Sequence, residues 1–275
     1  MHNQQQQDRG GSMLLLATGA AAVATVATLF PPPVSAWLPV AGIAIAIVLL
    51  AGLAQWILQQ DSGNAAGGST PSSLNPSQVL ELIKTRRSVF PKDMTGEAGA
   101  ISKQQLATML DAARWAPTHK LTEPWHFVVL SGAAKAAFEE LTIELCQQRL
   151  EPEKAEATVA KLRRKQAKDW PKVHCYIAIC LKRHQEVPEW EEIAAVACAV
   201  QNMALVGSSM GVHGYWSSWQ PAARDAPEMH ELLQIDAAKG DRCLGVFVVG
   251  QGQQERLAGY RPRRQELDEK VLWLQ

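Results

Sequence analysis

Two arginines and a serine, Arg86-Arg87-Ser88, stand together where a helix is expected to end. Each guanidinium group donates hydrogen bonds in a planar fork, and the hydroxyl adds another donor and acceptor. This combination suits a phosphate or an electron-rich heterocycle. The alternative interpretation is a solvated helix C-terminus, where the helix dipole favours positive charge. The arginines by themselves leave both interpretations open.

Three further segments carry hydrogen-bonding, aromatic or basic side chains. They are the loop Ala116-Pro117-Thr118-His119-Lys120 with the following Glu123-Pro124-Trp125-His126-Phe127, the strand end Gly214-Tyr215-Trp216-Ser217-Ser218-Trp219, and the basic run Arg261-Pro262-Arg263-Arg264. Aromatic rings stack on flat ligands, and hydroxyl or imidazole groups hydrogen-bond to ligand edges. Each segment is also compatible with ordinary packing or, for the basic run, with a solvated surface.

Several common kinds of site have no signature in the sequence. No Ser-His-Asp order, glycine-rich phosphate loop or metal-ligand pair stands out, and Gly250-x-Gly252 is too short for a dinucleotide fingerprint. The five cysteines form no CxxC pair, and their mostly apolar neighbours predict buried thiols in a reducing compartment. Lys+Arg and Asp+Glu both number 27, so no net positive field exists to attract nucleic acid.

Helices must position these groups. Ser77 and Ser102 are expected to cap two of them. A charged helix is expected at 151–169, and a long apolar helix at 189–210. The apolar helix has a face of small residues that permits close packing with another helix: Ala194, Ala197, Cys198, Ala204 and Ser208.

Strands alternate with these helices. They are expected at 125–130, 173–181, 214–219 and 243–250. The first two are apolar enough to be interior strands. Without any repeat, the pattern predicts an α+β domain in which helices pack on a short central sheet.

The N-terminal region differs in composition, because all charged residues except Asp8 and Arg9 lie from Asp61 onward. Residues 37–58 form an apolar run with tryptophans near both ends. As a helix the run places these tryptophans roughly 28 Å apart, close to the hydrocarbon thickness of a bilayer. Because tryptophan favours the membrane interface, we expect this run to anchor the protein.

A weaker apolar run at 13–30 ends in a triplet of prolines. It is interpreted as a second span, a cleaved signal or part of an organelle-targeting presequence. Membrane orientation and organelle are not readable from the charges. The expected organisation is a polar N-terminus at 1–12, a hydrophobic targeting or transmembrane region at 13–58, a flexible linker at 59–75 and a folded domain at 76–275.

Taken in order, the motifs resemble the short bacterial branch of the FMN-dependent nitroreductase family. The resemblance covers residues 76–275 and rests on Arg86-Arg87-Ser88-Val89, the block from Ala116 to Phe127, Val187-Pro188-x-Trp190-Glu191, the alanine-rich helix with Gln201-Asn202-Met203, and Gly214-Tyr215-Trp216-Ser217-Ser218. It implies a nitroreductase-like α+β fold whose mostly antiparallel central sheet is flanked by helices. In this chain one or two hydrophobic helices would precede that fold.

The resemblance also implies a homodimer with FMN sites shared between the subunits. Arg86, Arg87 and Ser88 would contact the ribityl phosphate and the pyrimidine edge, and Arg263 or Arg264 would complete the neutralisation of the phosphate. Trp216, Ser217 and Ser218 would lie along the isoalloxazine ring. Trp115, Thr118 and His119 would approach the same flavin from the partner subunit. Hydrogen bonds to a charged group contribute about 1.5–3 kcal/mol each, so several can retain a small anionic cofactor.

The implied activity is that of an oxidoreductase with NADH or NADPH as electron donor. A hydride would pass to the flavin, and a quinone, nitroarene or activated alkene would then take the electrons in the same pocket, in a ping-pong cycle. The resemblance assigns no catalytic side chain and no metal, since the flavin carries the redox chemistry.

Two departures from the family pattern keep alternatives open. Related short members often carry arginine where Trp115 and Ser217 stand, which allows a membrane-tethered flavin-binding module without turnover. Thr122-Glu123-Pro124-Trp125 is similar to a sequence of the membrane-anchored iodotyrosine dehalogenases, which allows a reductive dehalogenase-like enzyme. Those enzymes have a lid tyrosine, however, and no tyrosine lies between Ser131 and Cys175 here.

Overall fold

The computed structural model describes residues 75–96, 101–260 and 262–274. The chain divides into two units after residue 73, and all described residues lie in the second unit. The predicted polar N-terminus, the hydrophobic region and all of the predicted linker except Asn75 lie outside the described residues.

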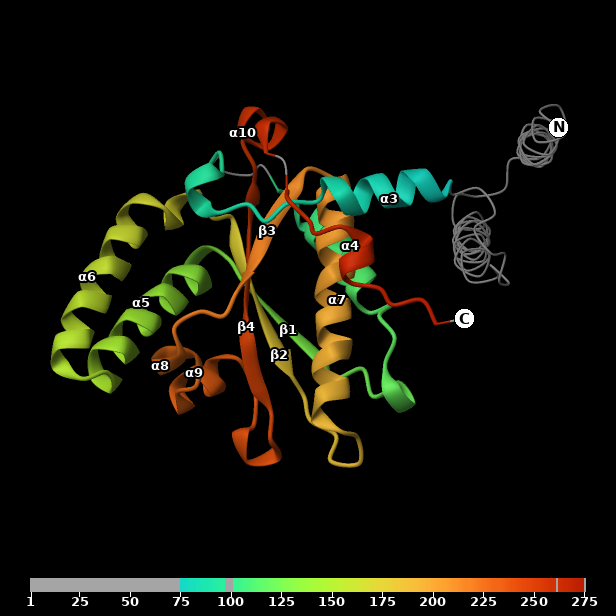
Figure 1. Ribbon diagram of the computed structural model, residues 1–275. Coiled ribbons are helices and arrows are strands. Elements are labelled where there is room, and N and C mark those ends of the chain that lie inside the picture. The colour runs from blue at the N-terminus through green and yellow to red at the C-terminus, as the bar shows by residue number, and fades with distance from the viewer. Residues whose placement is uncertain (1–74, 97–100, 261, 275) are drawn as a thin grey trace, which may run out of the picture. The chain divides into compact units, whose positions relative to one another are not determined.

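A four-stranded antiparallel sheet forms the centre of the described unit (Figure 1). Its strands lie in the order β1-β2-β4-β3: β1 (Trp125–Leu130), β2 (Cys175–Leu181), β4 (Arg242–Gln251) and β3 (Val212–Ser217). All three pairings are antiparallel. The predicted α+β class with a mostly antiparallel sheet is therefore confirmed.

The prediction of two interior strands is right for β2 and wrong for β1. Every residue of β2 is buried, because β2 lies between two strands and helices cover both of its faces. Among the described strands β1 pairs with β2 alone, and of its residues only Leu130 is fully buried. Its apolar residues are explained by packing, since Val128 contacts one core while Phe127 contacts the other.

Helices form a layer on each side of the sheet (Figure 1). One layer holds α5 (Gly132–Arg149), α6 (Pro152–Lys168), α8 (Pro221–Arg224) and α9 (Pro227–Leu232), and the other holds α4 (Lys103–Ala113) and α7 (Glu189–Ser209). Two helices lie near one end of the sheet, α3 (Pro76–Thr85) and α10 (Gln254–Gly259). Short 3-10 turns complete the described unit: η2 (Pro91–Asp93), η3 (His119–Leu121), η4 (Trp170–Lys172), η5 (Ala237–Lys239) and η6 (Leu267–Glu269).

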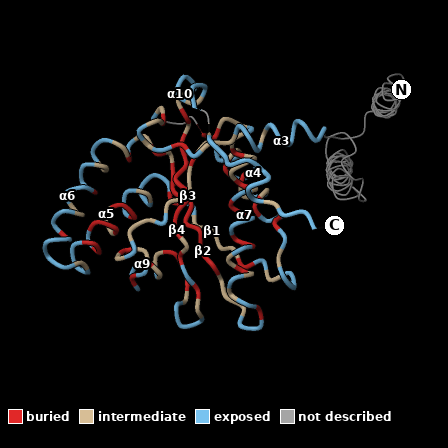
Figure 2. Tube along the Cα trace, viewed as in Figure 1, coloured by how far each residue is buried: buried red, intermediate tan, exposed pale blue. Residues whose placement is uncertain are grey.

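Two hydrophobic cores lie on opposite faces of the sheet, where buried residues concentrate (Figure 2). Alternation along β2 divides its side chains between them, with Tyr176 and Ala178 in the first core and Ile177 in the second. Aromatic rings close the first core: Trp219 lies 5.1 Å from Phe138 and 5.7 Å from Trp170 between ring centroids. Trp170 and Trp219 also line a cavity described below.

The helix caps agree only partly with expectation. Ser102 caps α4 in a reciprocal arrangement with Gln105, as predicted. The predicted cap of the first helix, Ser77, is wrong. Asn75 is the cap, and its side chain accepts a hydrogen bond of 2.9 Å from the Ser77 amide. Because Pro76 favours the first helical position, the residue before it takes the capping role.

Among the described helices, α7 is the one long and apolar enough to cross a membrane by length and composition. Its residues Val196, Ala199 and Met203 pack in the second core, as in the central helix of a globular domain. The predicted small-residue face is turned outward, with Ala197 and Cys198 exposed. The prediction of buried cysteines therefore holds for four residues and is wrong for Cys198.

Candidate functional site

Ser88 connects the arginine segment to the sheet. Its backbone forms a parallel β-bridge with Gly214, and the Val89 amide donates a hydrogen bond of 3.2 Å to the Gly214 carbonyl. A Cβ on Gly214 would lie 2.3 Å from the carbonyl oxygen of Val248 in β4, so glycine is required for the close packing of β3 against β4. The bridge brings the arginines beside β3.

A cavity of about 480 Å³ opens at this junction, and we call it the arginine cavity. Its polar lining comes from three segments: Arg86, Arg87 and Ser88 after α3, Lys92 and Asp93 in η2, and Arg256 and Arg264 near the C-terminus. A neighbouring cavity, also lined by Arg86, Arg87 and Arg264, extends to Gln201 of α7. The sequence segments predicted to bind phosphate are thus adjacent in space.

Hydrogen bonding leaves part of this arginine cluster unsatisfied. The Nε atoms of Arg86 and Arg87 are buried, and the described residues supply neither with a hydrogen-bond partner. Arg87 is held locally, since its Nη1 donates to the Arg86 carbonyl at 3.0 Å and its guanidinium lies 5.5 Å from the centre of the Tyr260 ring. Arg256 is paired with Asp93 at 2.6 Å. Buried donors without partners are costly, which favours an anionic ligand here.

A second cavity, of about 380 Å³, lies between α6 and β3, and we call it the aromatic cavity. Four rings line it: Phe90, Trp170, Tyr215 and Trp219. Its polar lining comprises Lys92, Lys165, Asp169, Ser217 and Gln220. Phe90 and Lys92 line both cavities, so the two adjoin. The arrangement places a cavity lined by aromatic rings beside a cationic cavity.

Tyr215 supplies a hydrogen-bonding group in the aromatic cavity. Burial raises the pKa of its phenol, and the nearby Asp169 carboxylate acts in the same direction while a hydrogen bond with Ser217 opposes it. The phenol therefore stays protonated at neutral pH and can donate a hydrogen bond.

Close backbone packing fixes the end of β3. Gly245 of β4 has φ 131°, and a Cβ there would lie 2.2 Å from the Ser217 carbonyl oxygen. Trp219 adopts a left-handed φ of 62° and is held by two hydrogen bonds, from its Nε1 to Thr142 at 2.9 Å and from its amide to the Ser217 hydroxyl at 3.2 Å. Left-handed backbone at a non-glycine residue persists only where the surroundings enforce it, which is common at functional sites.

The predicted site residues fall into separate groups. Arg86, Arg87, Ser88 and Arg264 line the arginine cavity, and Ser217 lines the aromatic cavity. Trp216 turns the other way, because it packs in the second core and its Nε1 donates to the Leu244 carbonyl at 3.0 Å. The Ser218 carbonyl accepts a hydrogen bond from Arg224, and Arg263 is exposed outside both linings.

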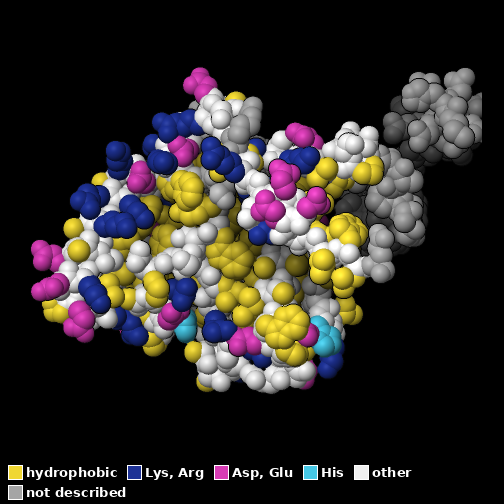
Figure 3. Space-filling view, in the orientation of Figure 1, with side chains coloured by type: hydrophobic (Ala, Val, Ile, Leu, Met, Phe, Trp, Pro, Cys, Tyr) yellow, Lys and Arg dark blue, Asp and Glu magenta, His cyan; other side chains and the backbone are white. Residues whose placement is uncertain are grey.

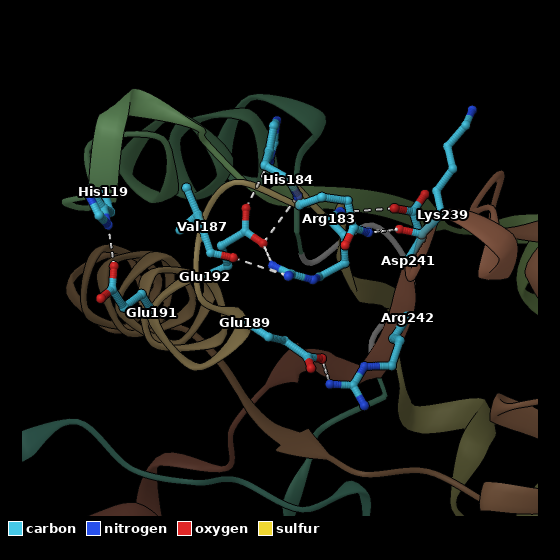
Figure 4. Close-up of polar contacts among 11 residues, drawn as sticks. His119, Arg183, His184, Val187, Glu189, Glu191, Glu192, Lys239, Asp241 and Arg242 are labelled. Carbon is cyan, nitrogen blue, oxygen red and sulfur yellow. Dashed lines mark hydrogen bonds and ion pairs between the residues drawn. The ribbon is translucent and has the colours of Figure 1, made fainter.

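Trp115, Thr118 and His119 lie at a different place, near the beginning of α7. His119 Nδ1 hydrogen-bonds to Glu191 on the first turn of that helix (Figure 4). Gln201, which borders the arginines, follows ten residues later, about 15 Å along the helix axis. Within one chain these three residues therefore do not join the two cavities.

The loop that carries His119 is strained. Lys120, Leu121 and Glu123 have φ of 53°, 55° and 45°, a region that side chains other than glycine rarely adopt. Trp115 precedes the loop in the sequence and is 72% exposed. Trp190 lies on the first turn of α7, next to the Glu191 that contacts His119, and is 70% exposed. Exposed large rings beside strained backbone are typical of a surface that contacts something else.

A buried ionic cluster holds the beginning of α7 against the sheet (Figure 4). Glu192 is 1% exposed and pairs with Arg183 and His184. The Asp241 carboxylate accepts hydrogen bonds from the Arg183 amide at 2.9 Å and the Asp236 amide at 3.1 Å. Because these charges pair with one another and with backbone amides, we interpret this cluster as structural. Among the described residues no group of three or more histidine, cysteine and carboxylate side chains could hold a metal ion.

Sequence reasoning missed most of the aromatic cavity. A signal for part of it was present, because Tyr215 and Ser217 alternate with Trp216 and so share one face of a strand. The contributions of Phe90, Lys165 and Asp169 come from distant segments without a recognisable spacing. They follow only from the packing of η2 and α6 against β3.

Comparison with known proteins gives one family. The model of the Nitroreductase family matches residues 83–251, more than half of the chain. YdjA of Escherichia coli (strain K12), whose name associates it with NAD(P)H nitroreductase activity, is 28% identical over 175 residues, covering 64% of this chain and 88% of YdjA.

Two solved structures share the fold. The nitroreductase-like protein from Bacillus cereus superposes with a TM-score of 0.56 at 22% identity, covering 76% of this chain and 99% of that one. The FMN-dependent nitroreductase NfnB from Mycobacterium smegmatis, solved in complex with NADPH, gives 0.55 at 14% identity, covering 73% and 100%.

Proposed function

The chain belongs to the nitroreductase family, and on that premise we propose that it is an FMN-dependent NAD(P)H oxidoreductase that reduces an electron-poor small molecule. The relatives support this proposal by their names, since NfnB is FMN-dependent and bound to NADPH, and YdjA is associated with NAD(P)H.

The adjoining pair of cavities carries the proposal. FMN joins a phosphate dianion to a flat tricyclic ring, and the arginine cavity adjoins an aromatic slot. The unpartnered Nε atoms of Arg86 and Arg87 fit the phosphate, with Ser88 and Arg264 as further donors. Phe90, Trp170 and Trp219 would contact the ring, and the polar groups of Ser217, Lys165 and Asp169 would face its edge. Arg263, Trp216 and Ser218 remain predicted contacts, the last two through backbone atoms.

FMN, when bound, would accept two electrons from NADH or NADPH and deliver them to a quinone, nitroarene or activated alkene. The chain's own groups bind and orient the reactants. Lys92 and Lys165 provide positive charge at the rims, and the protonated Tyr215 can donate a hydrogen bond. With the flavin ring bound in this slot, donor and acceptor are expected to bind in turn against the same exposed face of the ring, which gives ping-pong kinetics without a protein nucleophile.

We further propose a homodimer in which Trp115, Thr118 and His119 approach the flavin of the second subunit. Support comes from the outward face of α7 around Ala197 and from Trp190, a large exposed ring on the same helix. Replacing Ala197 with leucine should lower both dimerisation and flavin retention in size-exclusion chromatography. A monomer that keeps full FMN occupancy would contradict the shared site.

Membrane attachment through residues 37–58 is a separate proposal, with 59–75 as a flexible tether. It rests on the sequence, since these residues lie outside the described part except Asn75. Five free cysteines are consistent with a reducing compartment. Carbonate washing of membranes should leave the full-length protein in the pellet, and its release would contradict the anchor. An N-terminus at Trp37 or later would show that the first apolar run is removed.

Anaerobic spectroscopy tests the proposed activity. The full-length protein in detergent, loaded with FMN, should lose its visible flavin absorbance on addition of NADH or NADPH and regain it with a quinone or nitroarene. A flavin that neither donor bleaches would favour the alternative of a flavin-binding module without turnover. Turnover restricted to a halogenated aromatic acceptor would favour the dehalogenase-like alternative.

A further inference from the structure

Four cations form one stripe on α6. Lys161, Arg164, Lys165 and Lys168 follow the spacing i, i+3, i+4 and i+7, which places them on a single face of the helix. Their side chains are exposed or half-buried, and no ion pair joins any of them to a carboxylate among the described residues. Figure 3 shows lysine and arginine side chains gathered along this helix, beside an apolar hollow.

The stripe opposes the stability of its own helix. Lys161 faces Lys165 and Arg164 faces Lys168 at i, i+4, and such like-charge neighbours are destabilising. The helix dipole compensates for positive charge only in the last turn, near Lys165 and Lys168. Lys161 and Arg164 lie earlier and gain little from it. Arg163, on another face of α6, forms an ion pair with Glu140, unlike the four residues of the stripe.

The stripe runs alongside the aromatic cavity. Lys165 lines the cavity, as do Leu162 and Asp169 on the same side of α6. From Lys168 to Lys161 the stripe runs seven residues, about 10 Å, along the helix. In the cavity lining, Asp169 is the one carboxylate near the stripe. Its single negative charge is smaller than the positive charge of the four stripe residues. A ligand whose ring enters the cavity could thus reach the stripe with a distant anionic group.

We propose that the α6 stripe binds the 2′-phosphate of the electron donor and makes the protein select NADPH over NADH. This inference rests on the proposed function, because it assumes that a nicotinamide nucleotide binds over the flavin ring at the aromatic cavity. NADPH differs from NADH only in that phosphate, which carries nearly two negative charges at neutral pH. Arg164 supplies a planar fork suited to phosphate, and the lysines supply point charges.

Nucleotide fragments and donor kinetics test the proposal on the full-length, FMN-loaded protein. Calorimetry should show that adenosine 2′,5′-bisphosphate binds at least tenfold more tightly than 5′-AMP at low salt, with the difference shrinking as salt rises. The kcat/KM for NADPH should exceed that for NADH at least tenfold. The double variant Arg164→Gln, Lys168→Gln should lose most of both preferences while its rate with NADH stays within about twofold. Lys103→Gln, an exposed lysine of α4 on the other side of the sheet, is the matched control and should change neither.

Equal binding of the two fragments, or unchanged selectivity in the double variant, would overturn the proposal while leaving the FMN reductase intact. The proposal would also be overturned if the double variant lost binding to phosphatidylserine vesicles while its fragment binding matched that of the wild type. The stripe would then serve an anionic surface. If neither donor bleaches the flavin, the proposed function fails, and the fragment measurement still decides whether the stripe is a phosphate site.

Discussion

The rings of Phe90 and Tyr215 lie 4.6 Å apart between centroids, at an angle of 47°, where the arginine cavity meets the aromatic cavity. Phe90 belongs to the segment that carries the arginines, and Tyr215 belongs to β3. The pair therefore sets the position of a phosphate-binding group relative to a ring-binding slot.

Replacing Phe90 with alanine should weaken FMN binding about two- to tenfold, because an aromatic pair contributes about 0.5–1.5 kcal/mol. The melting temperature should change little, since Phe90 is 47% exposed. Quenching of FMN fluorescence measures the affinity. Phe90→Tyr, which keeps the ring, is the control. Equal affinities for wild type and Phe90→Ala would show that the pair does not shape the site.

Arg86 and Arg87 should behave differently when each is replaced by alanine. Both variants should lose FMN affinity about 10- to 150-fold, as expected for a charged hydrogen bond worth about 1.5–3 kcal/mol. Arg87→Ala should also lower the free energy of unfolding by about 1 kcal/mol, because Arg87 hydrogen-bonds to the Arg86 carbonyl and packs on Tyr260. Urea denaturation of the apo proteins separates the two effects. A larger stability loss in Arg86→Ala would contradict this assignment.

Gly245→Ala should distort the end of β3. The new Cβ would lie 2.2 Å from the Ser217 carbonyl oxygen, and φ of 131° is unfavourable for alanine. We expect a loss of at least about 2 kcal/mol in the free energy of unfolding together with weak flavin binding. Gly132→Ala is an informative control, because that glycine has a positive φ but open space around it. Normal stability and normal flavin content in Gly245→Ala would rule out the packing argument.

The buried Asp241 should make stability depend on acid pH. Burial would raise the pKa of this carboxyl, but hydrogen bonds from the Arg183 and Asp236 amides and from Lys182 outweigh it and lower the pKa below its usual value. A lowered pKa contributes stability above the unfolded-state value, about 3.9, and that contribution is lost as pH falls through the folded-state value. Asp241→Asn should therefore be less stable by about 1–3 kcal/mol at pH 7, with the difference narrowing below about pH 4. A difference that is constant with pH would exclude this origin.

Much of the fold follows from local pattern. The apolar runs predicted all four strands within about two residues, and Ser102 predicted the beginning of α4. The edge position of β1 was not predictable, because its apolar side chains pack under helices just as those of an interior strand do. Strand order depends on contacts between distant segments, which periodicity does not encode.

The candidate site likewise contains residues that the sequence predicted and residues that only the packing shows. Arg86-Arg87-Ser88 and Ser217 were recognisable as residues with ligand chemistry, whereas Lys165 and Asp169 looked like part of a solvated charged helix. Their role in the cavity depends on how α6 packs against β3. Trp216 shows the converse, since a motif placed it in the site although strand alternation turns its ring into the second core.

Comparison of FMN with riboflavin, which lacks the phosphate, tests the central claim most directly. Equilibrium titration of the full-length apo protein, followed by fluorescence quenching, should give one FMN per chain and an affinity at least about 100-fold higher than for riboflavin. Arg86→Ala should remove most of that difference while leaving riboflavin binding nearly unchanged. If FMN and riboflavin bind equally, or if neither binds, the arginine cavity is not a flavin phosphate site and the proposed oxidoreductase is contradicted.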